Sequence, residues 1–488
     1  MSGDTMMSSD PIMTSKDLEV LEKAIDEIWD VTLRLGLDPF PTHFEIVPAA
    51  IMYEFGAYGV PGRFSHWTHG KAYQRMKMMY DYGLSKIYEL VINTNPCYAF
   101  LLEGNSMLQN KLVAAHVLAH SDFFKNNLHF RHTSRQMMEM ASINAERIRS
   151  YEYRHGRREV EEFLDRVLCI EEHVDPNLSM RPKEWDREKD KEKEERAGAL
   201  HEGSYGDLFR LEQAQETPHE GEQPGKHRKF PSEPEKDLLL FIAEHAGDLE
   251  EWQRDIIHIV RNEQLYFVPQ MLTKIMNEGW ASYWHRAVMH ELDLPSDEYI
   301  QFANLNSAVT APSSHQVNPY YVGLKIFESI KERWDNPTEE EIRELGRQPG
   351  QGLAKLFEVR ELDSDVSFLR NYLSKELVDE LDLYIYKREG DQWVIVEKDW
   401  GKIRDMLVAS MTNFGVPYIV VEDGDYRRNR ELLLKHSYEG QELDLKYAER
   451  TLQAVFDLWG RPVHIETVVD DRKLLITFDG QRPTQTYI

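Results

Sequence analysis

Apolar residues recur at helical spacing over most of the first 345 residues of the chain. In this pattern the apolar positions fall three or four residues apart, so one side of each helix is apolar and packs against its neighbours. The segments with this pattern are Ser15 to Leu35, Leu108 to Phe124, Ser134 to His155, Arg158 to Glu172 and Asp237 to Phe267. We therefore expect a mainly α fold with one large helical domain over residues 15–345.

A charged segment interrupts this predicted domain. Between residues 176 and 235 the apolar periodicity fails, and every residue from Asp186 to Arg196 is charged. A segment of this composition buries too little apolar surface to offset the entropy that is lost on ordering. We interpret residues 176–235 as a charged insertion or linker, because the helical pattern resumes at Asp237.

The pattern changes from residue 357 onward. Two short apolar segments flank the turn formers Glu389-Gly390-Asp391, which is typical of a β-hairpin. The predicted strands of this region are Leu383 to Tyr386, Trp393 to Val396, Val416 to Val421, Val463 to Val468 and Leu474 to Phe478. With the helical segments between them, they predict a small C-terminal α+β domain over residues 357–488.

Charge and composition narrow the classes of function. The chain has 58 Lys and Arg against 85 Asp and Glu, a formal net charge of −27. Such a surface repels nucleic-acid phosphates and anionic lipid headgroups, so we expect no nucleic-acid partner. No segment approaches the roughly 18 apolar residues of a membrane-spanning helix, so we also expect no membrane insertion. Only two cysteines occur, which is typical of a cytoplasmic protein.

Two histidines, His116 and His120, lie four residues apart inside one predicted helix. This spacing places both imidazoles on one helix face, a turn apart, where they can bind the same metal ion. The alternative is structural, because the chain has 19 histidines and a histidine pair at this spacing also arises by chance in helix cores.

A second predicted helix carries a carboxylate and an imidazole, Glu278 and His285, two turns apart on one face. Both lie among large apolar residues, and a buried carboxylate requires a partner. We predict a metal site formed by His116, His120 and Glu278. Two histidines and one carboxylate leave coordination positions open for water or substrate. We expect a divalent metal, zinc, with iron as the alternative.

The usual general base of an HExxH peptidase is missing. In those enzymes a glutamate follows the first histidine directly, and here Val117 occupies that place. If hydrolysis occurs, the base comes from elsewhere, and Glu263 and His285 are our candidate catalytic residues. For Glu263 the alternative is an ion pair with Arg254 or another nearby basic residue.

Several separated segments resemble, in order, those of the stage V sporulation protein R (SpoVR) family. They are His66-Trp67 with Gly70-Lys71, Val91 to Cys97, Ala115 to His120 with Phe123 to Asn127, Glu250 to Ile256, Asn277 to Ala281 with Trp284-His285, and Asn318-Pro319-Tyr320. The resemblance implies a cytoplasmic bacterial protein of spore formation, linked to building the peptidoglycan cortex. It also implies two protein partners, an AAA+ serine protein kinase and a von Willebrand A-domain protein.

Two functions follow from these observations. Glu278-Gly279-Trp280-Ala281 after an HxxxH pair is similar to the third-ligand segment of some gluzincin-type metallopeptidases. The first function is therefore a metal-dependent hydrolase with a metallopeptidase-like helical domain that lacks the usual HExxH base. The alternative is a non-catalytic adaptor in a complex with the kinase and the A-domain protein, in which the histidines and Glu278 form a structural polar network. The reaction and its substrate stay open at this point.

Overall fold

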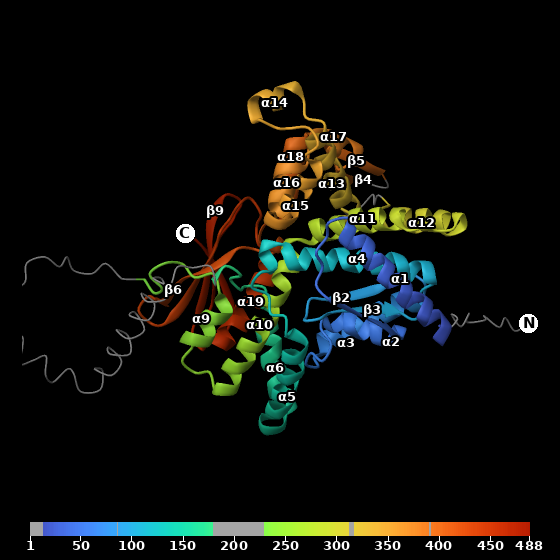
Figure 1. Ribbon diagram of the computed structural model, residues 1–488. Helices are drawn as coiled ribbons and strands as arrows, with labels where there is room; N and C mark the ends of the chain where they lie inside the picture. Colours follow the sequence, from blue (N-terminus) through green and yellow to red (C-terminus); the bar gives the residue numbers. More distant parts are fainter. Residues whose placement is uncertain (1–12, 85, 179–228, 312–316, 390–391) are drawn as a thin grey trace, which may run out of the picture. The chain divides into compact units, whose positions relative to one another are not determined.

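The structure is a computed structural model that describes residues 13–84, 86–178, 229–311, 317–389 and 392–488 (Figure 1). The chain divides into two compact units. The first unit consists of the residues up to Asp165 together with Ile259–Pro417, and the second of Arg166–His258 and Tyr418–Ile488.

The first unit is mainly helical. Its helices are α1 (Ser15–Arg34), α2 (Ala49–Tyr58), α3 (Trp67–Asp81), α4 (Met107–Asn126), η1 (Leu128–Phe130), α5 (Met137–His155), α11 (Lys274–Glu291), α12 (Ser296–Val309), α13 (Pro319–Asp335), α14 (Glu339–Leu345), α15 (Gly352–Leu362), α16 (Asp365–Tyr372), α17 (Lys375–Glu380), α18 (Trp400–Met411) and η3 (Thr412–Gly415). Its strands are β1 (Thr42–Val47), β2 (Glu89–Ile92), β3 (Cys97–Leu102), β4 (Ile385–Glu389) and β5 (Gln392–Glu397). Two of the boundaries between the units fall within α6 (Arg157–Leu168) and α10 (Glu251–Leu272), and the third lies between Pro417 and Tyr418.

A small sheet with the strand order β1-β3-β2 lies between two layers of helices in this unit (Figure 1). Side chains of β3 alternate between its faces, as in any strand. Ala99 and Leu101 pack with α1 and α4, whereas Phe100 and Leu102 pack with α2. Antiparallel pairing sets Glu89 of β2 opposite Leu101, so Glu89 shares the face that α4 covers.

Helix α11 lies at the centre of the helical part and contacts both α4 and α13. Its tryptophans pack in one large apolar core with side chains of α13, α15 and α16. Among the core residues are Trp280, Phe327, Leu356 and Phe368. Because these residues come from segments far apart in the sequence, the position of α11 depends on the packing of the whole unit.

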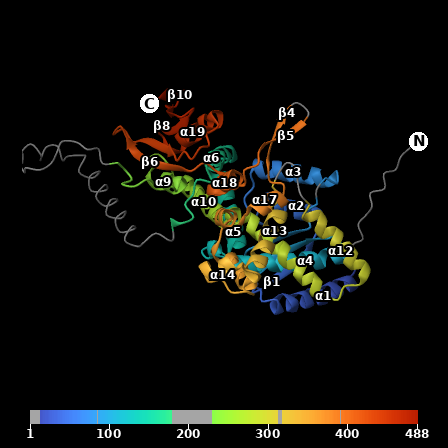
Figure 2. The ribbon, with the colours of Figure 1, turned by 90° about the horizontal axis from the view of Figure 1, so that it is seen from above.

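The second unit contains a five-stranded sheet with the order β10-β9-β8-β7-β6. Its strands are β6 (Ile419–Tyr426), β7 (Glu431–His436), β8 (Val463–Val469), β9 (Arg472–Phe478) and β10 (Pro483–Tyr487), and its further helices are α9 (Leu238–His245) and α19 (Leu445–Trp459). Figure 2 shows α19 beside this sheet, where it contacts β8 and β9. Leu452 and Val455 of α19 are buried, because the apolar face of this helix packs against the apolar face of the sheet.

The predicted fold class is confirmed in its coarse form, a mainly helical chain with a small C-terminal sheet domain. The compact units divide the chain differently from the predicted boundary at residue 357. Helices α15–α18 belong to the first unit, because Val359, Phe368 and Leu377 are buried in the same core as Trp280. The backbone of Glu235 pairs with that of Val421 in the second unit. The predicted charged insertion falls mostly on residues 179–228, which lie outside the described residues.

Several local predictions agree with the structure, and one region was underpredicted. The predicted hairpin is present as β4 and β5, and the strands predicted near residues 463 and 474 are present as β8 and β9. The mixed pattern between residues 44 and 97 did not predict the sheet of β1, β2 and β3. Within the described ranges, no helix combines the length and the apolar character needed to cross a membrane.

Candidate metal centre

Helix α4 carries the two histidines through the most deeply buried part of the first unit. Ser106 and Gln109 form a capping box at its start, which satisfies free backbone N–H groups of the first turn. Every residue from 112 to 124 is buried. His116 and His120 are each 6% exposed, so their polar nitrogens need partners inside the protein.

Helix α11 brings Glu278 to these histidines. The backbone N–H groups of Ile275 and Met276, in its first turn, donate to the Asp365 carboxylate at 2.9 Å each. This carboxylate caps the helix and interacts favourably with its dipole. Next to Glu278, Gly279 allows α13 to approach, because a Cβ at this position would lie 2.4 Å from the carbonyl carbon of Gly323.

Three ligand atoms converge between the two helices. Nε2 of His116 and Nε2 of His120 are 3.0 Å apart, and Oε2 of Glu278 lies 3.7 and 3.5 Å from them. Two ligands bound about 2.1 Å from a tetrahedral ion are about 3.4 Å apart. The three distances bracket this value, so the predicted residues lie at the spacing that one metal ion requires.

The hydrogen bond behind His120 fixes its tautomer. Nδ1 of His120 lies 2.8 Å from Oδ1 of Asn277, and an amide oxygen only accepts, so Nδ1–H of His120 donates. Nε2 of a neutral His120 then carries a lone pair and faces the other two ligand atoms. A partner of this kind orients a metal-binding histidine and sets its tautomer.

Two hydrogen bonds in series, through His285, fix the tautomer of His116 in the same way. Nε2–H of His285 donates to Oδ1 of Asn306 at 2.9 Å, which leaves Nδ1 of His285 as an acceptor. Nδ1–H of His116 donates to it at 2.9 Å. Nε2 of His116 is therefore left with a lone pair that points at the centre of the three ligand atoms.

Two lone pairs and a carboxylate that face one another repel unless a proton or a cation lies between them. Burial by itself would raise the pKa of Glu278, but the imidazoles of His116 and His120 outweigh it and hold the pKa well below its usual range. Burial by itself would lower the pKa of His120, but the Glu278 carboxylate raises it overall. The centre thus attracts positive charge, as a metal site must.

His285 is held neutral by its surroundings. Burial, followed by the neighbouring His116, lowers the pKa of His285 to about 3. Both of its nitrogens are engaged, one with His116 and one with Asn306. The geometry gives His285 the role of orienting His116, whereas the sequence made it a candidate catalytic residue.

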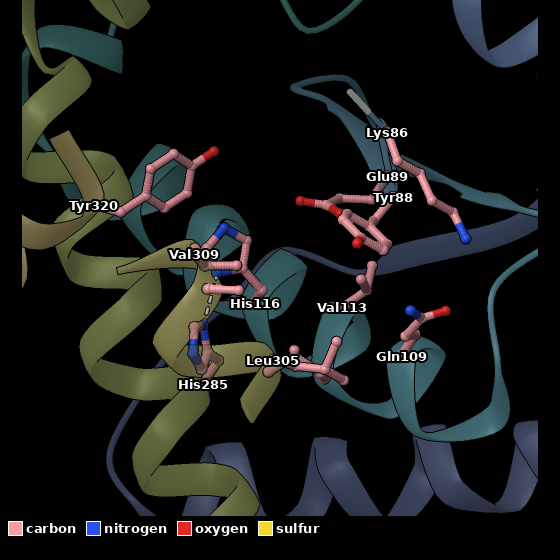
Figure 3. A pocket seen from close by; sticks show the side chains of 12 residues that line it. Lys86, Tyr88, Glu89, Gln109, Val113, His116, His285, Leu305, Val309 and Tyr320 are labelled. Carbon is pink, nitrogen blue, oxygen red and sulfur yellow. Dashed lines mark hydrogen bonds between the residues drawn. The ribbon is translucent and has the colours of Figure 1, made fainter. Parts of the chain in front are cut away.

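A pocket of about 350 Å³ opens beside the centre. Figure 3 shows Glu89, His116 and Tyr320 around it, with His285 behind His116. The lining residues are Lys86, Tyr88, Glu89, Gln109, Leu112, Val113, His116, His285, Leu305, Ala308, Val309 and Tyr320. Burial raises the pKa of both Glu89 and Tyr320. The site therefore combines open access with acidic and phenolic groups close to the ligand atoms.

Glu263, the other candidate catalytic residue, does not line this pocket. Its Oε2 accepts a hydrogen bond from Nε of Arg63 at 2.6 Å, in an ion pair whose side chains are 11% and 3% exposed. This pair differs from the predicted alternative, a local pair with Arg254 or another nearby basic residue, because Arg63 lies 200 positions away in the chain and the pair is buried. Glu263 is not brought together with His116, His120 and Glu278 in the group of three.

Sequence reasoning did not single out Glu89, Asn277, Asn306 or Tyr320 as site residues. Asn277 and Tyr320 lie in segments that carry the SpoVR resemblance, and Asn318 caps the helix that begins at Pro319 and so places Tyr320. Glu89 had one usable signal, a carboxylate at the start of the apolar run Leu90 to Ile92. Nothing in the sequence indicates that Asn306 contacts His285, because the two residues lie on different helices, α12 and α11, and the pattern of each helix gives no information about its neighbour.

Comparisons with known proteins match almost the whole chain. The family model described as SpoVR like protein matches residues 15–416, and the one described as SpoVR-like C-terminal domain matches residues 417–470. The chain belongs to the SpoVR family. The junction of the two SpoVR models coincides closely with the boundary between the compact units at Pro417 and Tyr418.

One curated relative matches over almost its full length. The uncharacterized protein YcgB of Escherichia coli (strain K12) is 28% identical over 492 residues, covering 96% of this chain and 95% of its own. No solved structure matches the chain. The kinase and A-domain partners, the cytoplasmic location and the metallopeptidase-like character stay predictions.

Proposed function

We propose that this SpoVR protein is a metal-dependent hydrolase that serves in spore formation, with His116, His120 and Glu278 as its metal ligands. The observation that carries the proposal is the hydrogen-bond pattern behind the two histidines. Asn277 and His285 accept the Nδ1–H groups of His120 and His116. In the neutral imidazoles the two Nε2 lone pairs therefore face the Glu278 carboxylate, and a bound cation would relieve their repulsion.

Zinc fits this set of ligands best. Two neutral imidazole nitrogens and one carboxylate form a common catalytic zinc set, with a further position open to water. The pocket, which His116 also lines, supplies space beside the ligands. A bound divalent ion would polarise a substrate carbonyl and acidify water at this point. Iron binds similar sets, so the metal analysis below distinguishes between the two.

The family suggests the setting of this reaction. Membership in the SpoVR family supports a role in sporulation, and the formation of the peptidoglycan cortex is the finer proposal. In a spore-forming bacterium that lacks its own family member, we expect the wild-type chain to restore heat-resistant spores. A metal-free but folded His120→Ala variant would not restore them, and equal rescue by this variant would contradict a role for the metal.

Metal content of the purified full chain tests the site itself. We expect about one zinc per chain in the wild type and in His132→Ala, a control at an exposed histidine just outside α4. We expect less than about a tenth of that in His120→Ala and in Glu278→Gln, with unchanged circular dichroism. A wild-type chain that stays metal-free after incubation with zinc, manganese and ferrous iron would overturn the proposal.

A further inference from the structure

Glu89 is a carboxylate that the proposed ligand set does not use. It lies at the start of β2, opposite Leu101, on the sheet face that α4 covers. Its side chain lines the pocket. Among the residues that the structure describes, no hydrogen bond or ion pair is formed by its carboxylate.

A structural role does not explain a carboxylate at this position. Its neighbours on the same face are Val91, Ala99 and Leu101, all apolar and packed against α1 and α4. Glu89 is only partly buried and faces the open pocket, and an apolar side chain would pack on this apolar face at least as well. The partner of Glu89 is therefore expected among the molecules that enter the pocket.

Glu89 is placed beside the metal ligands without belonging to them. The ligand atoms of His116, His120 and Glu278 all lie within 4.8 Å of one another, and Glu89 is outside this group. Two atoms bound to one zinc ion are at most about 4.2 Å apart. Glu89 and His116 nevertheless line the same pocket, so a molecule bound there can contact both.

The opposite side of this space is formed by Tyr320. Figure 3 shows Glu89 and Tyr320 on opposite sides of the space above His116. The Tyr320 ring stacks on that of His116 with centroids 6.1 Å apart. A molecule in the pocket thus meets His116 on one side, the Glu89 carboxylate on the second and the Tyr320 phenol on the third.

We infer that Glu89 is the general base of the reaction at this centre, in the place of the glutamate that an HExxH helix would carry where Val117 stands. This inference rests on the proposed function. Glu89 takes one proton from the reacting water, whose oxygen adds to the substrate carbonyl carbon. The carbon–nitrogen or carbon–oxygen bond then breaks, and the same proton passes from Glu89 to the departing nitrogen or oxygen.

The pocket also limits the substrate class. Leu112, Val113, Leu305, Ala308 and Val309 form an apolar wall next to the polar groups. A volume of about 350 Å³ is at the small end of the range for ligand sites. The substrate is therefore an amide or ester with a short aliphatic group beside its carbonyl, either as a small molecule or as one or two units of a longer chain.

Acetohydroxamic acid is a suitable probe for this base. It binds a metal ion through two oxygens and gives its hydroxyl proton to a neighbouring base. Its Kd for the zinc-loaded full chain can be measured by isothermal titration calorimetry, together with the zinc content of each variant. We expect Glu89→Gln to keep its zinc and to raise the Kd at least about tenfold, because a charge-assisted hydrogen bond is lost.

A control and three contrary outcomes make the test decisive. Glu45→Gln changes an exposed glutamate of β1 in the same sheet and should leave the Kd unchanged. An unchanged Kd in zinc-loaded Glu89→Gln would overturn the inference, and loss of zinc from this variant would instead make Glu89 a ligand. The base assignment also fails if Glu89→Gln keeps its zinc but the Kd of acetohydroxamic acid is the same for the zinc-loaded and the metal-free wild type. A wild type that binds none of zinc, manganese and ferrous iron refutes the proposed function itself, which is a different result.

Discussion

Nδ1 of His116 lies 2.9 Å from Nδ1 of His285, so one imidazole of α4 is oriented by another from α11. The second nitrogen of His285 donates to Asn306 of α12. Three helices thereby determine which nitrogen of His116 carries its proton. A partner behind a metal ligand fixes the ring and raises its basicity, and this relationship leads to the first prediction.

His285→Phe should weaken zinc binding about 10- to 100-fold, because His116 loses the acceptor that fixes its tautomer. Competition with a chelator of known affinity measures the change. His285→Gln offers an amide oxygen to the same N–H and should recover much of the affinity. His290→Phe, at an exposed histidine of the same helix, should bind zinc normally. Equal affinity of His285→Phe and the wild type would show that the hydrogen bond between His116 and His285 does not act on the metal.

Asn277 should affect zinc binding through His120 in the same way. Asn277→Ala removes the acceptor of Nδ1–H, now at 2.8 Å, and should lower the zinc affinity about tenfold or more. Asn277→Asp places a carboxylate there, which makes the imidazole a stronger ligand, so its affinity should equal or exceed that of the wild type. The same chelator competition measures both variants, and an aspartate variant weaker than the alanine variant would contradict the assigned tautomer.

Gly279→Ala should destabilise the first unit by at least about 3 kcal/mol, because the new Cβ would meet backbone atoms of Gly323 at 2.4 and 2.5 Å. Backbone atoms in packed helices cannot move aside as a flexible side chain does. Gly70→Ala is the matched control, since a Cβ in that helix meets nothing within 4 Å and should stabilise by about 0.5–1 kcal/mol. Urea unfolding compares the two, and similar midpoints would refute the close approach of α11 and α13.

The stability of the first unit should fall as the pH drops from about 6.5 to about 4. Burial, with a smaller contribution from Arg63, lowers the pKa of His69 to about 4. The unfolded chain, in which His69 has its ordinary pKa of about 6.5, therefore binds a proton that the folded chain does not. The contribution of the neutral His69 to the free energy of unfolding is fully present above the pKa that His69 has in the unfolded chain. About 2 kcal/mol of this contribution is lost by pH 5.

Substitution identifies the contribution of His69. Nδ1–H of His69 donates to the carbonyl of Phe64 at 3.2 Å, and His69→Asn keeps a donor there without a titrating ring. The difference in unfolding free energy between pH 7 and pH 5 should be about 2 kcal/mol smaller in this variant. His132→Asn, at an exposed histidine, serves as the control. The same pH dependence in His69→Asn and the wild type would rule out His69 as the cause.

The sequence singled out the three candidate ligands that the structure brings together, but not the groups around them. His116 and His120 are four residues apart, and helical spacing alone places them on one face. In the segment from Asn277 to Trp280 each residue has a separate contact, and the sequence singled out only Glu278. Trp280 donates through Nε1 to Asp122 at 2.9 Å, and Asn277 holds His120. These contacts join residues more than 150 positions apart, beyond the reach of any local pattern.

The amino-acid sequence by itself determined the mainly helical class, the C-terminal strands and the three candidate ligands, because periodicity and spacing within one helix are local properties of the chain. Only the tertiary structure decided that Glu89 lies in the pocket, that His285 orients His116 and that Glu263 pairs with Arg63. Those relationships depend on the register of β2 with β3 and on the packing of α4, α11 and α12. Both are set by many weak contacts between distant segments, which no single stretch of sequence specifies.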